Sequence, residues 1–295
     1  MERIFTSNAT NELTEHVTYH RLAQMEKNPE NREALERLSA QEKTHYEFWI
    51  SLLPETEGKK IRARWYTVWG LSFLRITLGV TFMTKFLETH ENDAVEKYQS
   101  IAKMIPESHR VRFARIIEDE KSHEKALIGQ LKEKRVAYMG FIVLGLADAI
   151  VEITGVDAGF LGVTGSTLIA GVAGIIVGFS AAISMGSASY LQAKQNTEQS
   201  AVLSGFLTWV SYFCSVILLA LPYFLIHVMI PAFIISTSVG ILLVAGFTFY
   251  GAVVFDRKFW REFSETVGLM LATALATFLL GTIVGALFHI NPASF

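Results

Sequence analysis

EDEKSHEKALIGQLKEKRVAYMGFIVLGLADAIVEITG, residues 118–155, is the stretch that decides the fold of this chain. Its first half has the charged pattern of a polar helix, and a basic cluster at residues 132–135 follows. Its second half has the pattern of an apolar helix and is interrupted only by Asp148 and Glu152. The chain therefore changes from a polar to an apolar helical class near Val136.

Charge is distributed unevenly over the 295 residues. Asp, Glu, Lys and Arg number 43 in residues 1–135 and 11 in residues 136–295. We therefore predict an all-α chain with a polar helical domain at 1–135 and a transmembrane helical domain at 136–295, because so apolar a segment needs lipid as its solvent. The net charge of −2 and the lack of a basic stripe argue against nucleic acid as a partner. The single cysteine, Cys214, excludes a disulfide within the chain.

The polar domain has the pattern of four helices. Thr6 or Ser7 is expected to cap the first helix, and Asn28-Pro29 is expected to start the second. The four helices are predicted at about 7–27, 29–53, 87–105 and from 107 into the basic cluster. The apolar runs within residues 59–86 are short for a membrane span, so we expect an interfacial or bundle-bridging helix there, with a sixth span as the alternative.

An internal repeat runs through these helices. Glu12 precedes Tyr19 by seven residues, and Glu91 precedes Tyr98 by the same interval. The motif Glu-Lys-Thr-His at 42–45 begins 30 residues after Glu12, and Glu-Lys-Ser-His at 120–123 begins 29 residues after Glu91. Four features that recur in register indicate two copies of one helical pair.

The spacing suits a metal centre. Residues three apart share a helix face, so Glu42 with His45, and Glu120 with His123, each present an oxygen and a nitrogen in one direction. One Glu from each of two helices and Glu-x-x-His from each of the other two form the di-iron carboxylate arrangement. Carboxylate and imidazole ligands suit Fe, Mn or Zn, and carboxylates offset the charge of two buried cations.

These motifs resemble the rubrerythrin branch of the ferritin-like superfamily over about 125 residues. The resemblance implies a four-helix bundle, a di-iron cofactor and iron ligands at Glu12, Glu42, His45, Glu91, Glu120 and His123. It also implies that Glu88, one turn before Glu91, is an alternate carboxylate ligand. Rubrerythrins usually add a rubredoxin module, for which this chain lacks the cysteines.

Five apolar runs follow the polar domain, at about 137–157, 159–191, 201–224, 228–255 and 266–289. Basic residues precede the first run and follow the second and the fourth: Lys132, Lys134 and Arg135; Lys194; Arg257, Lys258 and Arg261. By the positive-inside rule we predict a multi-pass protein of the cell membrane with a cytoplasmic N-terminal domain and an outer C-terminus. The N-terminus lacks the apolar core of a signal peptide, which agrees with a cytoplasmic domain.

Asp148 and Glu152 lie four residues apart near the middle of the first run. A carboxylate inside a membrane is costly and points by default to an ion pathway, although a structural hydrogen-bonded pair is the alternative. Met185 lies in SMGSASYL within the second run, where small residues let helices approach closely. A lone Met is more often a core residue than a ligand.

These spans resemble the vacuolar iron transporter family: GLADAIVEITG matches its first-span motif and SMGSASYL its second-span motif. The resemblance implies a homodimer that exports Fe²⁺ or Mn²⁺ in exchange for protons, with Asp148 and Met185 in the pathway. Some relatives carry a carboxylate where this chain has Val177, and Glu152 is expected to supply that charge. Together the two halves resemble the membrane-bound ferritins of prokaryotes.

We therefore expect an exporter of cytosolic Fe²⁺, and also of Mn²⁺, whose di-iron domain captures or senses iron. The alternative is an enzyme: a membrane-anchored ferroxidase or peroxide reductase in which the spans serve only as an anchor. Storage alone is a third reading, but it requires a closed shell that five spans disfavour.

Overall fold

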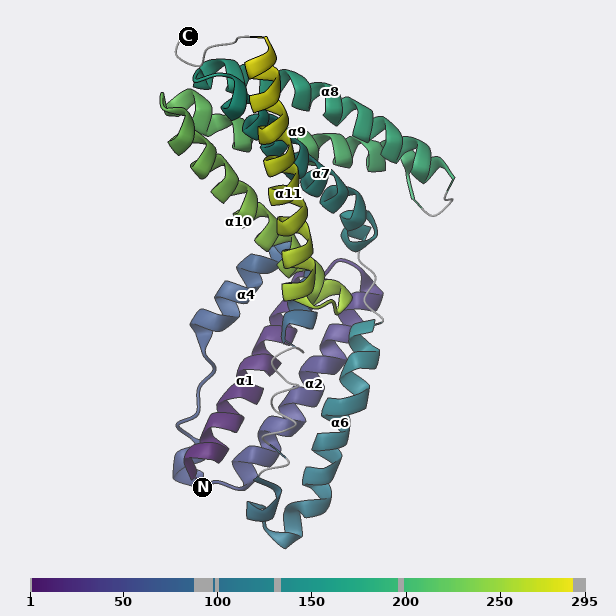
Figure 1. The fold of residues 1–295 in the computed structure, drawn as a ribbon. Coiled ribbons are helices and arrows are strands. Elements are labelled where there is room, and N and C mark those ends of the chain that lie inside the picture. The colour runs from purple at the N-terminus through teal and green to yellow at the C-terminus, as the bar shows by residue number, and fades with distance from the viewer. Residues whose placement is uncertain (1, 88–97, 99–100, 130–133, 196–198, 289–295) are drawn as a thin grey trace. The chain divides into compact units, whose positions relative to one another are not determined.

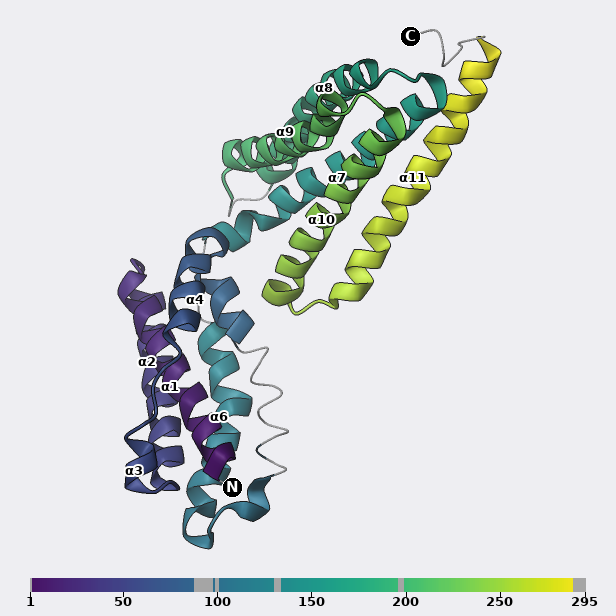
Figure 2. The same cartoon turned by 90° about the vertical axis from the view of Figure 1, so that its left-hand side faces the viewer.

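The computed structural model describes residues 2–87, 98, 101–129, 134–195 and 199–288, without the side chains of 121–129, 134 and 135. Throughout this part the secondary structure is helical and contains no strand, as the sequence predicted. The chain divides into two compact units, Met1–Glu133 and Lys134–Phe295. Each is considered by itself (Figures 1 and 2).

The N-terminal unit is built on three long helices: α1 (Glu2–Met25), α2 (Pro29–Ser51) and α6 (Arg110–Gly129). Helix α2 packs between the other two and contacts both. Shorter elements connect them: α3 (Glu55–Gly58), α4 (Trp65–Leu78), a helical segment at 80–87, and the 3₁₀ turns η1 (Ala102–Met104) and η2 (Glu107–His109). The third bundle helix, predicted at 87–105, lies mostly outside the described residues.

Local capping explains the first two helices in part. The Asn28 side chain accepts hydrogen bonds from the backbone N–H groups of Glu30 and Asn31, and Pro29 occupies the first turn of α2, which confirms the predicted start. The predicted cap at Thr6 or Ser7 is wrong, because α1 begins at Glu2. Thr6 lies inside that helix, where its carbonyl accepts from the Thr10 hydroxyl at 2.8 Å.

An aromatic core fixes the spacing of the bundle helices. Phe48 and Trp49 of α2 are fully buried against Phe113 of α6 and Tyr98. The Trp49 ring lies 5.2 Å from that of Tyr98 and 5.7 Å from that of Phe113, in tilted and edge-on geometries that aromatic pairs favour. This layer holds the polar side chains of α1 and α2 in a dry interior.

Helix α4 packs along α1. Arg75 donates to Glu26 at 2.8 Å, and the Arg21 guanidinium lies 3.6 Å from the centre of the Trp69 ring. The helix ends at Gly79, whose φ of 92° favours glycine. The 14 residues of α4 span roughly 21 Å, less than the ~30 Å of a hydrocarbon core, so α4 alone is too short to cross a bilayer. The large apolar side chains on its other side are exposed: Trp65, Tyr66, Phe73 and Ile76.

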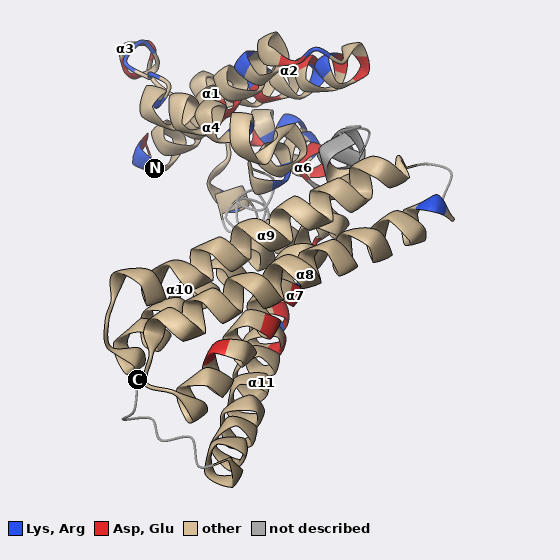
Figure 3. Ribbon diagram, turned by 90° about the horizontal axis from the view of Figure 1, so that it is seen from above, with Lys and Arg blue, Asp and Glu red and all other residues tan. Residues whose placement is uncertain are grey.

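The second unit contains the five helices that are long and apolar enough to cross a membrane: α7 (Lys134–Val163), α8 (Thr167–Lys194), α9 (Ala201–Leu225), α10 (Met229–Phe255) and α11 (Phe259–Leu287). Helix α7 is the hub, since it contacts each of the other four. Figure 3 shows how few charged residues these helices carry compared with those of the N-terminal unit.

Two predicted boundaries are wrong. We placed the first turn near residue 158, but α7 continues to Val163, and α8 starts after Ser166, whose side chain accepts from the Ile169 N–H. The last helix begins at Phe259 rather than near 266. Its first turns are charged, and an ion pair of 3.0 Å between Arg261 and Glu265, one turn apart, supports them.

Glycines let the membrane helices touch. A Cβ at Gly178 of α8 would lie 2.5 Å from the Val216 side chain, and one at Gly186 would lie 3.0 Å from the carbonyl of Gly205. This confirms the close approach predicted for the second span. At the other side of the hub, a Cβ at Gly281 of α11 would lie 2.2 Å from the carbonyl of Gly159.

Candidate metal centre and membrane carboxylates

Three predicted ligands converge inside the N-terminal unit. Glu12 of α1 and Glu42 and His45 of α2 are buried, and one ligand atom from each lies within 4.8 Å of the other two. The Nδ1 atom of His45 lies 3.5 Å from Glu42 Oε2 and 3.7 Å from Glu12 Oε2. The i, i+3 spacing on α2 therefore directs an oxygen and a nitrogen to one point, as the sequence indicated.

The two oxygens of Glu12 have different surroundings. Oε1 accepts hydrogen bonds from the Trp49 indole N–H at 3.1 Å and from the Tyr98 hydroxyl. Oε2 is buried and has no hydrogen-bond partner among the described residues. The two donors orient the carboxylate and leave one oxygen available to a cation, as outer hydrogen bonds do in metal sites.

Helix α6 adds a third carboxylate. Glu120 is largely buried, and its Oε1 lies 3.4 Å from His45 Nδ1. Asp119 lies on the other side of the imidazole, with Oδ2 3.9 Å from Nε2. Metal-binding histidines commonly present their second nitrogen to a carboxylate, so Asp119 is placed to orient His45.

The electrostatics of this cluster favour a cation. Burial by itself would lower the pKa of His45, but the carboxylates of Glu12, Glu120 and Glu42 raise it well above its usual range. Burial would raise the pKa of Glu12, and its contacts with His45 and its hydrogen bond from Tyr98 lower it on balance. Burial and the negative charge of Glu12 raise the pKa of Tyr98, which keeps its hydroxyl proton for donation. The cluster thus gathers negative charge around the His45 imidazole, which would have to lose a proton before a metal ion could bind to it.

The donor set passes a simple test of fit. Glu12 Oε2 and His45 Nδ1, which lie 3.7 Å apart, are buried without a hydrogen-bond partner in the described part of the chain, which is costly unless a cation engages them. Oxygen and nitrogen donors in this mixture suit Fe, Mn or Zn. Glu88, Glu91 and the side chain of His123 lie outside the described residues.

Residues 4–129 match the rubrerythrin family. The match covers this N-terminal unit, whose buried Glu12, Glu42 and His45 are the metal-type cluster described above. No curated protein and no solved structure matches the chain. We refer to Met1–Glu133 below as the rubrerythrin-like unit.

In Lys134–Phe295, called the membrane unit below, the two carboxylates of the first membrane-capable helix share a neighbour. Asp148 and Glu152 are both half-buried on α7, and their carboxyl groups interact with each other. The Tyr212 hydroxyl of α9 donates to Glu152 Oε2 and lies within reach of the Asp148 charge. The two acids therefore face one way, as their four-residue spacing predicted.

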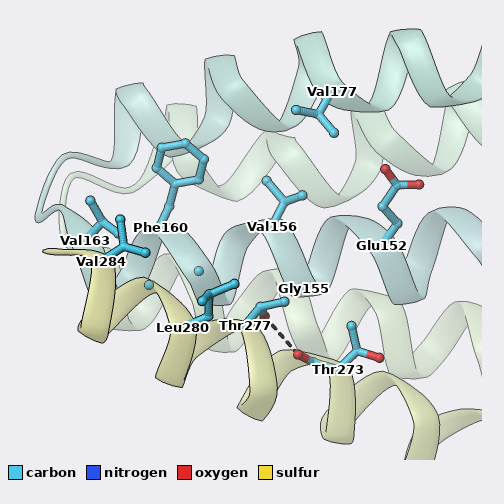
Figure 4. Close-up of a pocket in the computed structure, with 12 residues that line it drawn as sticks. Glu152, Gly155, Val156, Phe160, Val163, Val177, Thr273, Thr277, Leu280 and Val284 are labelled. Carbon is cyan, nitrogen blue, oxygen red and sulfur yellow. Dashed lines mark hydrogen bonds between the residues drawn. The ribbon is translucent and has the colours of Figure 1, made fainter. Parts of the chain in front are cut away.

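A cavity of about 550 Å³ opens beside Glu152, between α7, α8 and α11 (Figure 4). Its walls are almost wholly apolar, and Glu152, Thr273 and Thr277 carry its polar side-chain atoms. Figure 4 shows Glu152 with its carboxylate turned toward the helix that bears Val177. Glu152 and Val177 thus line one cavity, which fits the expectation that Glu152 supplies a charge at this point.

Met185 lies in apolar surroundings. It packs half-buried on a cluster that includes Ala182, Tyr212 and Val216. Tyr212, which donates to Glu152, belongs to the same cluster.

Sequence reasoning missed four polar residues. Trp49 and Asp119 lie beside the buried cluster in the N-terminal unit, and no motif in the sequence marks either of them. Tyr212 and Asp157 went unnoticed in the membrane unit. Only Asp157 had a local signal, an acidic residue within an apolar run; the others become visible when helices distant in sequence are packed together.

Proposed function

We propose that this protein exports cytosolic Fe²⁺, and also Mn²⁺, across the cell membrane in exchange for protons, and that the rubrerythrin-like unit captures or senses the metal. The observation that carries the proposal is the buried Glu12, Glu42 and His45 cluster, in the same chain as five membrane-capable helices whose hub bears Asp148 and Glu152.

The described part of the capture site would use residues from three helices. Glu12 Oε2, Glu42 and His45 would hold one ion, and Glu120 lies close enough to His45 to join them. By the sequence repeat, Glu91 and His123 would complete the second half of a di-iron site, with Glu88 as an alternate ligand. A bound iron pair supplies redox chemistry, while Trp49 and Tyr98 fix the Glu12 carboxylate and Asp119 orients His45.

The membrane path would run along α7. A divalent cation that loses its hydration water needs oxygen ligands in its place, which Asp148 and Glu152 would provide. Tyr212 would hold the Glu152 carboxylate in position. Met185 would favour a transition ion over Mg²⁺. A second cavity, of about 250 Å³, is lined by Ala147 of α7 together with Arg257 and Glu262. It lies at the end of the unit where the basic residues predict the cytoplasm, and it would lead an ion to the neighbourhood of Asp148.

Transport in liposomes tests the proposal. Purified full-length protein would be reconstituted, an anaerobic Fe²⁺ gradient or a Mn²⁺ gradient imposed, and metal and proton movement followed separately. We expect metal flux in the wild type and none in Asp148→Asn, which keeps the side-chain shape but removes the charge. Asp256→Asn is the matched control, because Asp256 follows α10 in a left-handed conformation that Asn tolerates. Equal flux in Asp148→Asn and wild type would refute the pathway.

A second candidate, a membrane-anchored ferroxidase or peroxide reductase, is favoured by the rubrerythrin match and by the ordered hydrogen bonds around Glu12. It predicts oxygen or peroxide consumption when Fe²⁺ is added to the full chain, lost in Glu42→Gln and unaffected by Asp148→Asn. Consumption without metal flux would favour the enzyme over the exporter.

A further inference from the structure

Asp157 is a second acidic site in the membrane unit. It lies on α7 nine residues after Asp148, which is about two and a half helical turns, so the two side chains leave opposite sides of the helix. Its side chain is almost completely buried, at 1% exposure. It takes no part in lining the cavity beside Glu152.

The groups around Asp157 come from three other helices. Ser236 of α10 and Tyr223 of α9 face the carboxyl group, and Gly174 of α8 brings that helix so near that a Cβ there would lie 3.5 Å from Asp157 Oδ1. Tyr223 is the titratable neighbour. Within the described part of the chain, no Lys, Arg or His forms an ion pair with Asp157.

Asp157 receives little stabilisation from Ser236. The Ser236 hydroxyl donates to the backbone carbonyl of Leu219 at 2.8 Å and to Asp157 Oδ2 at 3.3 Å. One hydroxyl hydrogen shared by two acceptors is a weak donor to the more distant one, so a negative charge on Asp157 would be poorly stabilised from this side.

The rest of the site agrees with a neutral acid. Asp157 Oδ1 and the Tyr223 hydroxyl are buried, and neither makes a well-formed hydrogen bond within the described residues, although Tyr223 lies close enough to act on the carboxyl group. An ionised carboxylate with two neighbouring hydroxyls and no cation would be very costly in an apolar bundle, whereas a neutral carboxyl group does not carry that cost.

The site also lies toward one end of the bundle. Asp157 is six residues, or roughly 9 Å, from the end of α7 at Val163, and Tyr223 is two residues from the end of α9. The charge pattern of the sequence predicts this end to face the outside. A proton arriving from the outside would therefore meet Asp157 before Asp148.

We propose that Asp157 is the proton-binding site of the membrane unit, separate from the metal path at Asp148 and Glu152. At rest the carboxyl group is neutral. Release breaks its O–H bond, passes the proton to water on the cytoplasmic side and leaves a carboxylate, which the Tyr223 and Ser236 hydroxyls would stabilise by donating to it; uptake of a proton from water on the outer side reforms the O–H bond. The coupling role rests on the proposed export function, but the protonation state does not.

Infrared spectroscopy and liposome flux test the two parts separately. The variant Asp157→Asn mimics the neutral acid, since its amide has nearly the same shape and no charge, and Asp256→Asn is the control. We expect the wild-type protein to show a carboxylic C=O band that Asp157→Asn loses and the control keeps. A band that persists unchanged in Asp157→Asn overturns the proposal.

In liposomes of the full chain, we expect Asp157→Asn to pass Mn²⁺ down its gradient but to lose the accompanying proton movement, while the control keeps both. Wild-type proton movement in Asp157→Asn overturns the coupling role. If the wild type moves no metal, the export function fails, and the infrared band still decides whether Asp157 holds the proton. Should Asp157→Asn not fold, Ser236→Ala provides the second measurement: loss of the neighbouring hydroxyl shifts the carboxylic band if the band belongs to Asp157, and an unshifted band overturns the proposal.

Discussion

The two carboxylate oxygens of Glu12 have different surroundings, and this difference leads to a specific prediction for Glu12→Gln. The amide oxygen of Gln can accept the hydrogen bonds that Trp49 and Tyr98 now donate to Oε1, so the bundle should keep its packing. The amide nitrogen would replace Oε2, the buried oxygen that faces His45 at 3.7 Å and has no hydrogen-bond partner among the described residues. The substitution therefore removes a metal ligand and leaves the surrounding hydrogen bonds in place.

The expected loss of metal-dependent stabilisation follows from the linkage between Mn²⁺ binding and folding. At a Mn²⁺ concentration about 100 times the dissociation constant, binding stabilises the folded unit by about 2.7 kcal/mol, which raises amide protection about 100-fold. If the variant binds roughly 100-fold more weakly, the upper range for disturbed metal sites, the same concentration raises protection only about twofold, or about 0.4 kcal/mol.

Hydrogen exchange of α1 and α2 in the full-length protein, with and without Mn²⁺, measures this difference. Glu12→Gln also removes the charge interaction between Glu12 and His45, so the response of each protein to Mn²⁺ is compared with its own metal-free state. Glu36→Gln is the matched control, since Glu36 lies exposed on α2 and pairs with Arg32 on the surface. A variant that gains as much protection from Mn²⁺ as the wild type would refute the assignment of Oε2 as a ligand.

Three other predictions follow from the structure. Trp49→Phe removes a buried donor to Glu12, so it should cost about 1–3 kcal/mol of stability in a denaturant titration and weaken Mn²⁺ binding, and unchanged values would argue against an orienting role. Glu26→Gln should destabilise the unit at pH 7 by about 1 kcal/mol, because burial would raise the pKa of Glu26 but hydrogen bonds from the backbone and Arg75 lower it on balance. That stability is present above the unfolded-state pKa and is lost as the pH falls through the lower folded-state pKa, so the two proteins should converge in acid, and a constant difference would contradict the ion pair. Gly281→Ala should separate α7 from α11 and lower the thermal stability of the membrane unit, whereas Gly268→Ala on the same helix, where a Cβ meets nothing within 4 Å, should not; equal effects would contradict the packing.

Much of this structure could be predicted from the helical periodicity and the composition of the sequence. The charge step near Val136 and the lengths of the apolar runs predicted an all-α chain with five membrane-capable helices, because both properties depend only on residues close in sequence. The same holds for Glu42 and His45, which share a face of α2 through their spacing. The rubrerythrin resemblance, noted first from the Glu-x-x-His repeat, agrees with the match over residues 4–129.

Tertiary packing decided what local spacing could not. Whether an oxygen of Glu12 is occupied or available depends on Trp49 and Tyr98, which lie 37 and 86 residues away. The sequence predicted a turn near residue 158, where glycines and an acidic residue interrupt the apolar run. Helix α7 nevertheless continues to Val163, because it packs against the other membrane helices along this stretch. The burial of Asp157 and the weak donor it faces depend on Ser236 and Leu219, which come from two other helices. A sequence states which side chains share a helix face, but a hydrogen bond between helices exists only once their packing has brought donor and acceptor within about 3 Å.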